Sequence, residues 1–460
     1  MYIQQIYTGC LAQAAYYIES EGEAAIIDPL RDIQAYLDIA AARNAKIKYI
    51  FETHFHADFV SGHIDIAKKT GAKIVYGPTA KASYDIIVAN DMQEFPLGNE
   101  KIQVLHTPGH TLESSSFLAK DANGKAYALF SGDTLFVGDV GRVDLAANEK
   151  LTREELAFKM YDSVERLKKL SDDIVVYPGH GAGSACGKNI GKETTTTIGA
   201  QRKANYALQP MDREAFIKMM VSGLPTPPKY FFMDAKINRN GYEEDMDSLL
   251  GHNVNALTVA DFIREKEAGA TILDTRTAAE YAKEHVPGSI NIGLNGDFAV
   301  WTGTIIDNVS LILVCAEGKE MESVMRLARV GYDKVKGFLK GGVAAWKEAG
   351  QKAKSVHSIT AEEFAKNIEK EGQPLDVRNE SEVMQGTVRD AITIPLGKLT
   401  EQLKTLDKNA HYYVYCKGGY RSMAGVSILE KNGFTNLTNV EGGMNAIEKT
   451  QAKIEVPAEA

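Results

Sequence analysis

The chain has 460 residues, which exceeds one ordinary hydrophobic core and predicts about three domains. Apolar residues make up 44% and charged residues 25%, a balance typical of globular proteins that excludes a disordered or fibrous chain. The net charge of −9 disfavours non-specific binding to nucleic acid or to an anionic membrane, because both need a basic surface.

The N-terminal residues lack the basic start, apolar run and cleavage site of a secretory signal. No apolar run approaches the roughly 20 residues of a membrane span. The cysteines are isolated and include no CxxC pair: Cys10, Cys186, Cys315 and Cys416. Such cysteines indicate a reducing compartment and thiol chemistry rather than disulfides. We therefore expect a cytoplasmic protein, with a homo-oligomer of unspecified size as its assembly.

Residues 1 to about 190 alternate short β-rich runs with helical stretches. The predicted strands end in polar loops and cover residues 24–29, 46–54, 73–77, 101–110, 127–136 and 173–181. In several of them the polar end carries His or Asp, which is how an active site is built along one rim of a sheet. Residues 201–209 and 212–223 look helical, and we interpret them as an extension of this first domain.

The remainder of the chain is an internal repeat. Residues 257–292 recur as residues 359–394, so that Asp274 matches Asp376 and Cys315 matches Cys416. A period of about 100 residues predicts two small α/β domains, each around a mostly parallel sheet. We place the domains at 1–255, 256–352 and 357–455.

Six side chains in the first domain form a candidate metal constellation. His54, His56 and Asp58 alternate directly after a predicted strand, so one extended segment can aim them into one cavity. His110, Asp133 and His180 follow later, each at a strand end. One such residue would suggest a structural role, but the set indicates a metal site.

The HxHxD, PGH, GD and late GH elements resemble, in this order, the metallo-β-lactamase superfamily. The resemblance implies an αββα sandwich with the metal between two sheets, in an α/β multidomain protein. Phe59 departs from the pattern, because the superfamily's second metal site commonly has a His there. Phenylalanine cannot ligate, so the second site retains at most Asp58, His180 and a shared Asp133.

This departure favours the mononuclear, iron-using persulfide dioxygenases over dizinc hydrolases such as glyoxalase II. For that branch the resemblance implies one Fe(II) per chain with ligands His54, His110 and Asp133, surrounded by His56, Asp58 and His180. Two imidazoles and one carboxylate form the facial triad of non-haem iron oxygenases. Zinc, which has no redox chemistry, remains an alternative metal, and a zinc thioester hydrolase the alternative function.

Three further residues are candidates for binding substrate near the metal. Arg142 and Asp144 resemble the GRxD segment of the dioxygenases, where the arginine would hold a carboxylate or phosphate of a carrier thiol. The alternative is a structural Arg–Asp pair that fixes a loop. Cys186 follows His180 closely and is a candidate sulfur acceptor, or a small residue that fills a Gly-rich loop.

The second repeat carries a reactive-cysteine loop. A β-rich run ends at Cys416, and the loop continues with Lys417, Gly418, Arg421 and Ser422 before a predicted helix. Backbone N–H groups of the turn and the helix N-terminus favour a thiolate. The CxxGxRS pattern resembles the rhodanese sulfurtransferases. In the first repeat, Glu320 stands where the arginine belongs, which disfavours a thiolate at Cys315 and predicts a degenerate domain.

Together these elements resemble persulfide dioxygenase–sulfurtransferase fusions of bacterial sulfide detoxification. The resemblance implies that a low-molecular-weight persulfide of glutathione, coenzyme A or bacillithiol reacts with O₂ to give sulfite. Cys416 then transfers sulfane sulfur to sulfite, which gives thiosulfate. A non-enzymatic redox sensor or scaffold is the alternative from another class.

Overall fold

The computed structural model describes residues 1–224 and 226–457. The chain forms two compact units, of which the first contains Met1–Met246 and Ala328–Gly331. The second contains Asp247–Leu327 and the residues from Tyr332 onward. Within the described residues, no helix combines the length and the apolar character needed to cross a membrane.

Two six-stranded sheets make up the centre of the first unit. The strands of the first sheet, in order, are β1 (Tyr2–Thr8), β2 (Gln13–Ser20), β3 (Glu23–Ile27), β4 (Lys46–Glu52), β5 (Lys73–Tyr76) and β6 (Ile87–Val88). Those of the second are β12 (Thr196–Thr197), β11 (Val175–Pro178), β10 (Ala126–Gly132), β9 (Ser115–Lys120), β8 (Glu100–His106) and β7 (Glu94–Leu97).

The inner faces of the two sheets pack against each other through alternate strand residues. Tyr16 and Phe51 of the first sheet belong to one buried cluster with Phe117 and Phe130 of the second. The Phe51 and Phe117 rings lie 4.9 Å apart between centroids. This period-two burial is expected where each sheet has one face on a shared core.

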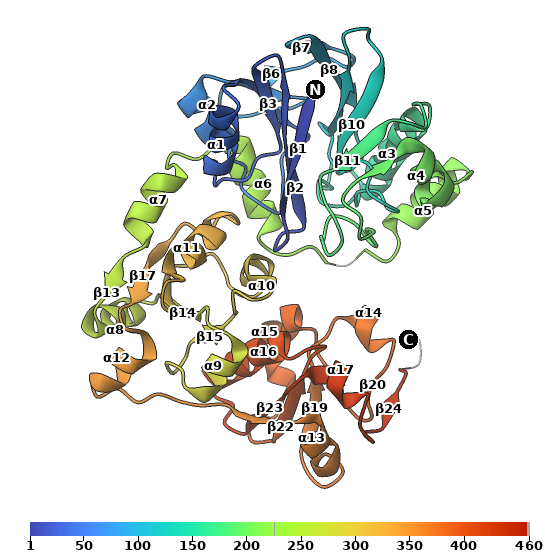
Figure 1. Ribbon diagram of the computed structural model, residues 1–460. Coiled ribbons are helices and arrows are strands. Elements are labelled where there is room, and N and C mark those ends of the chain that lie inside the picture. The colour runs from blue at the N-terminus through green and yellow to red at the C-terminus, as the bar shows by residue number, and fades with distance from the viewer. Residues whose placement is uncertain (225, 458–460) are drawn as a thin grey trace. The chain divides into compact units, whose positions relative to one another are not determined.

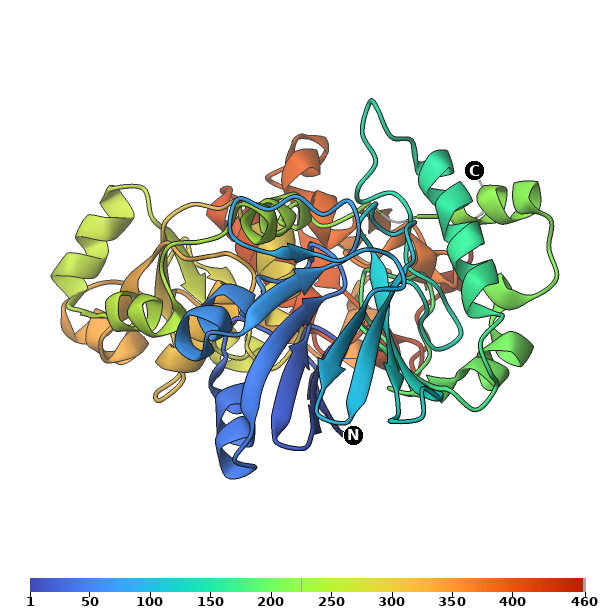
Figure 2. The same cartoon turned by 90° about the horizontal axis from the view of Figure 1, so that it is seen from above.

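Helices cover the outer face of each sheet (Figure 1, Figure 2). The first sheet is covered by α1 (Gln34–Ala42) and α2 (His63–Thr70), and the second by α3 (Arg153–Leu167), α4 (Ile198–Ala204) and α5 (Arg213–Val221). The predicted αββα sandwich is therefore confirmed. The residues 201–209 and 212–223 that the sequence predicts to be helical form the end of α4, a 3-10 helix at Tyr206–Leu208, and α5. Two further helices follow along the chain, α6 (Phe231–Asn240) and α7 (Met246–Asn253).

Strand direction brings the polar strand ends of the first unit to one rim. β3 runs parallel to β4, and β10 runs parallel to β11. β8 has the direction of β10, because both are antiparallel to β9. In the second sheet, the loops that carry His110, Asp133 and His180 therefore follow strands that share one direction.

The second unit contains two five-stranded sheets of equivalent topology. The first sheet has the order β13 (Ala256–Leu257), β17 (Val335–Leu339), β16 (Leu311–Val314), β14 (Thr271–Asp274) and β15 (Ile290–Asn291). The second has the order β18 (His357–Ile359), β23 (Leu437–Val440), β22 (Tyr412–Tyr415), β19 (Gln373–Asp376) and β21 (Ile392–Thr393). All pairs in both sheets are parallel, which confirms the predicted pair of α/β domains.

The helices of the two repeats alternate with these strands. The first repeat has α8 (Val259–Glu267), α9 (Ala278–Lys283), α10 (Phe298–Ile305), α11 (Glu320–Ala328) and α12 (Gly342–Glu348). The second has α13 (Ala361–Asn367), α14 (Glu380–Val383), α15 (Leu399–Gln402), α16 (Tyr420–Lys431) and α17 (Gly443–Ile447), with a small antiparallel sheet of β20 (Thr387–Val388) and β24 (Ile454–Glu455).

Candidate metal centre and cysteine loop

Three buried donor atoms converge at the rim of the sandwich. Nε2 of His110 lies 3.5 Å, and Nε2 of His54 4.0 Å, from Oδ2 of Asp133. The His54 Nε2 and Asp133 Oδ2 atoms have no hydrogen-bond partner among residues 1–224 and 226–457. Buried polar atoms without partners are unfavourable unless something compensates them. Two imidazoles and a carboxylate with atoms this close fit one metal ion.

Hydrogen bonds fix both imidazoles with Nε2 toward this point. His110 donates through Nδ1 to the carbonyl oxygen of Arg142, over 2.8 Å. Nδ1 of His54 lies 2.9 Å from Oγ1 of Thr53, which itself donates to Oδ2 of Asp28 over 2.9 Å. The Thr53 hydroxyl therefore accepts a hydrogen bond from His54 and links this imidazole to the Asp28 carboxylate. Such outer partners set the tautomer and orientation of metal-binding histidines.

Burial and the neighbouring His56 hold the pKa of His54 well below its ordinary value, so this imidazole is neutral, as a ligand must be. For Asp133, burial acts against ionisation, but the adjacent His180 outweighs it and lowers the pKa of the carboxyl well below its usual range. Asp133 is therefore an ionised donor. Gly132 permits the approach of its strand, because a Cβ there would lie 2.6 Å from Thr53.

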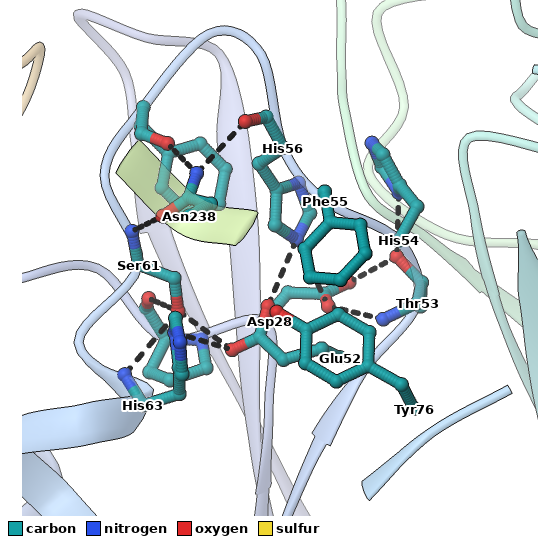
Figure 3. A network of polar contacts seen from close by, with 12 residues as sticks. Asp28, Glu52, Thr53, His54, Phe55, His56, Ser61, His63, Tyr76 and Asn238 are labelled. Carbon is teal, nitrogen blue, oxygen red and sulfur yellow. Dashed lines mark hydrogen bonds and ion pairs between the residues drawn. The ribbon is translucent and has the colours of Figure 1, made fainter. Parts of the chain in front are cut away.

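The His56 ring is directed toward the carboxylates of Asp28 and Glu52 (Figure 3). Its Nε2 lies 3.0 Å from Oδ1 of Asp28 and 3.4 Å from Oε2 of Glu52, and the Phe59 ring stacks on it at 4.3 Å. Burial opposes its protonation, yet the two carboxylates raise the pKa of His56 well above its ordinary value. An imidazolium cannot ligate a cation, so His56 stays outside the donor set.

The loop that carries these residues is held by a segment far away in sequence. Asn238, on α6, donates from Nδ2 to the carbonyl oxygens of His56 and Phe59, over 2.8 and 2.7 Å. Its Oδ1 accepts from the backbone N–H of Ser61 at 2.9 Å (Figure 3). Ser61 in turn donates from Oγ to Glu52 over 2.6 Å. α6 thereby fixes both the loop and one of the carboxylates that retain His56.

His180 is also held between two carboxylates. Its Nδ1 lies 2.8 Å from Oδ1 of Asp133, and its Nε2 lies 2.7 Å from Oδ2 of Asp58. Burial disfavours the charged ring, but Asp133 and Asp58 together raise the pKa of His180 to about 10. His180 and Asp58 therefore neutralise each other beside the three donors, and neither points into the donor set.

Arg142 is committed to contacts within the protein. Its Nε and Nη2 donate to the two carboxylate oxygens of Asp144, each over 2.7 Å, and Nη1 donates to the carbonyl oxygen of Ala185 over 3.1 Å. This geometry matches the structural alternative for the pair, and substrate binding by Arg142 and Asp144 stays a prediction. Cys186 is buried near Asp58 and His180. Burial, and then Asp58, raise the pKa of its thiol well above the ordinary value.

The Cys416 loop contains a backbone N–H group that donates a hydrogen bond to the cysteine sulfur. Cys416 is buried directly after β22, and the backbone N–H of Gly419 donates to its Sγ over 3.1 Å. Gly419 has φ +99°, which favours glycine at this position. α16 begins at the next residue, so its N-terminus also faces the loop. Lys417 and Gly418 are exposed at the turn.

Arg421 and Ser422 are anchored on either side of the loop. The guanidinium of Arg421 forms a two-pronged ion pair with Glu382, over 2.6 and 2.7 Å, which the sequence analysis missed. Ser422 donates from Oγ toward Oδ1 of Asn439 over 2.8 Å.

In the first repeat, burial raises the pKa of Cys315 to about 11, and Glu320 adds to that rise. The expected electrostatic effect of Glu320 is present, although burial is the larger cause.

Comparisons with known proteins agree with this architecture. Residues 8–180 match the metallo-beta-lactamase superfamily, and residues 258–349 and 360–450 each match the rhodanese-like domain. A metallo-beta-lactamase from Staphylococcus aureus subsp. aureus COL is 33% identical, with 74% of this chain and 99% of that chain covered and a TM-score of 0.66. The chain therefore belongs to the metallo-beta-lactamase superfamily and carries two rhodanese-like domains.

Two other solved structures each match part of the chain. ETHE1 from Myxococcus xanthus is 28% identical over 52% of this chain and 98% of that chain, with a TM-score of 0.45. A rhodanese-related protein from Thermoplasma volcanium is 35% identical over 22% of this chain and 99% of that chain, with a TM-score of 0.21. The family matches, and not these two structures, show that the chain joins a domain of metallo-beta-lactamase fold to a tandem of rhodanese-like domains.

The Thr53 hydroxyl is expected to support metal binding through His54. Thr53→Val keeps the shape of the side chain but removes the link between Asp28 and His54, so metal affinity should fall by about 10–100-fold. Thr53→Ser keeps the hydroxyl and should bind metal as the parent protein does. The measurement is a Zn²⁺ titration of metal-free protein against a competing chelator. Equal affinities for the two variants would show that the hydroxyl has no such role.

Proposed function

We propose that the first domain is a persulfide dioxygenase with one Fe(II), and that the last domain is a sulfurtransferase that acts through Cys416. The observation that supports this most is the composition of the donor set. Among the residues that the structure describes, only two imidazoles and one carboxylate have atoms directed to the common point, because His56 and His180 are each engaged by carboxylates. Three protein ligands leave positions free for exogenous ligands.

Iron fits this set better than zinc. His54, His110 and Asp133 would hold Fe(II), which supplies the redox chemistry with O₂ that converts the outer sulfur of a persulfide to sulfite. Zinc has no redox chemistry and activates water instead. The protein's own contribution is orientation: Thr53 and the Arg142 carbonyl hold the two imidazoles, and His180 holds the carboxylate.

The last domain supports sulfur transfer through a cysteine persulfide. The Cys416 thiolate attacks the outer sulfur of R–SSH, the S–S bond breaks, and the carrier leaves as a thiol after protonation. Sulfite then attacks the outer sulfur of Cys416–SSH, which releases thiosulfate and regenerates the thiolate. The Gly419 N–H stabilises negative charge on Sγ. Lys417 is exposed beside the cysteine and adds positive charge for an incoming anion, whereas the charge of Arg421 is paired with Glu382.

The substrates proposed are a low-molecular-weight persulfide, O₂ and sulfite. Glutathione, coenzyme A and bacillithiol are the proposed alternatives for the carrier thiol. One chain that carries both activities raises the local concentration of sulfite for Cys416. Such a role in sulfide detoxification belongs in the cytoplasm, where the cysteines stay reduced. The competing proposal, a zinc-dependent thioester hydrolase, would require activity with zinc and none of this oxygen chemistry.

Removal of one imidazole should separate the two activities. His110→Ala should lose bound iron and at least about 100-fold of persulfide-dependent O₂ consumption, because one of three ligands is gone. Transfer of sulfur from a persulfide to added sulfite should continue, since it uses Cys416. His106→Ala, whose ring bonds to the Leu112 carbonyl outside the donor set, is the matched control. Undiminished O₂ consumption by His110→Ala would contradict the assigned site.

The two rhodanese-like repeats should differ in product formation. Cys416→Ser should abolish thiosulfate, so that sulfite accumulates while O₂ is still consumed. Cys315→Ser should change little, because burial and Glu320 keep the pKa of that thiol high, at about 11, and it stays protonated near neutral pH. Product analysis with persulfide and O₂ tests both. Loss of thiosulfate in Cys315→Ser, with retention in Cys416→Ser, would reverse the roles of the repeats.

A further inference from the structure

The helix α16 of the second repeat packs against the first repeat. Both repeats belong to the second compact unit, and β15 and α9 lie against α16 (Figure 1). The backbone N–H of Asn291, on β15, donates to Oγ of Ser427 over 3.0 Å. Near the C-terminal end of α16, Oε1 of Glu430 lies 3.2 Å from Nε2 of His285. The first repeat therefore contacts the second half of this helix through hydrogen bonds and charge.

Tyr420 connects the start of the same helix to the first repeat. It is the first residue of α16 and lies between Gly419 and Arg421 in the sequence. Its hydroxyl donates to the carbonyl oxygen of Gly293 over 2.7 Å. Gly296 allows this approach, because a Cβ there would lie 2.6 Å from Cε2 of Tyr420. Burial raises the pKa of the Tyr420 phenol above its ordinary value, so the hydroxyl stays protonated and can donate.

The N–H group that contacts the cysteine sulfur belongs to the residue just before Tyr420. Gly419 donates this N–H to Sγ of Cys416 over 3.1 Å. Because glycine has no side chain that could pack, the position of this N–H depends on the neighbouring residues. Arg421, on the other side of Tyr420, also meets the first repeat, since its Cζ lies 5.9 Å from the centroid of the Trp301 ring on α10. This distance is within the range of a cation–π interaction.

The corresponding residue of the first repeat has a different role. Lys319 follows Cys315 by four positions, as Tyr420 follows Cys416. Nζ of Lys319 lies 2.9 Å from Oε2 of Glu322, in an exposed ion pair one turn away. The tyrosine therefore distinguishes the second copy, whose cysteine loop contacts the neighbouring repeat.

We propose that the first repeat forms part of the sulfurtransferase site, and that Tyr420 is the residue through which it positions the Cys416 loop. This inference rests on the proposed sulfur transfer by Cys416. With Tyr420 bound to Gly293, the Gly419 N–H is already directed at Sγ when negative charge forms there, so the loop needs no reorganisation. The repeat whose own cysteine is disfavoured as a nucleophile thus supports the reaction of the other.

Tyr420→Phe in the full-length chain removes the hydroxyl and keeps the ring. The rate at which iodoacetamide alkylates Cys416 near neutral pH, followed on its peptide by mass spectrometry, should fall by about three- to tenfold, because a hydrogen bond that orients the Gly419 N–H is lost. The pH profile of this alkylation should move to higher pH. For sulfur transfer from a persulfide to sulfite, kcat should fall by a similar factor, whereas KM for sulfite should stay unchanged because the exposed Lys417 is retained.

Tyr412→Phe is the matched control, because its hydroxyl accepts from the Asp407 N–H within the second repeat, and it should be alkylated as the parent protein is. Gly296→Ala changes only the first repeat, yet it should also slow alkylation of Cys416, because the added methyl group meets the Tyr420 ring. An unchanged alkylation rate and pH profile in Tyr420→Phe or in Gly296→Ala would overturn the proposal. Alkylation needs neither persulfide nor sulfite, so a parent protein that transfers no sulfur would contradict the proposed function and not this contact.

Discussion

The structure of the metal centre depends on carboxylates that hold buried histidines. His56 lies between Asp28 and Glu52, and His180 lies between Asp58 and Asp133. Each arrangement compensates charges that would be costly to bury alone. Each arrangement also keeps one histidine ring from facing the common metal position. These two histidines belong to the HxHxD and late GH elements, which commonly supply metal ligands in the superfamily. Because these two histidines are held by carboxylates, His54, His110 and Asp133 remain as the donors. Three donors leave coordination positions open, and this supports the proposal that substrate and O₂ bind there.

The rhodanese-like repeats show how small changes separate two copies of one fold. Both keep a parallel sheet of the same strand order, and both place a buried cysteine directly after the third strand of that order. In the second copy, a glycine N–H donates to Sγ and an arginine follows nearby. In the first, Glu320 opens the corresponding helix. A carboxylate there opposes thiolate formation, so the fold is retained while the proposed chemistry is restricted to Cys416.

Much of this architecture was predictable from sequence, because strand and helix periodicity, the internal repeat and the spacing of His and Asp are local patterns. The convergence of His54, His110 and Asp133 follows from strand ends that share one rim. The retention of His56 by Asp28 and Glu52 was not predictable, because carboxylates beside a metal motif are equally compatible with ligation. The role of Asn238 was not predictable either, because it contacts His56 and Phe59, which lie 182 and 179 positions away in the sequence. The ion pair between Glu382 and Arg421 was not predicted from the sequence either, because these two residues are also far apart along the chain.

We propose that catalysis in the first domain depends on one iron held by two histidines and an aspartate. The most direct measurement is metal content and persulfide-dependent O₂ consumption on the same preparations, reconstituted with graded iron or with zinc. The rate should rise in proportion to iron and reach its maximum at about one iron per chain. Activity that follows zinc, in iron-free protein with two zinc ions per chain, would contradict this proposal.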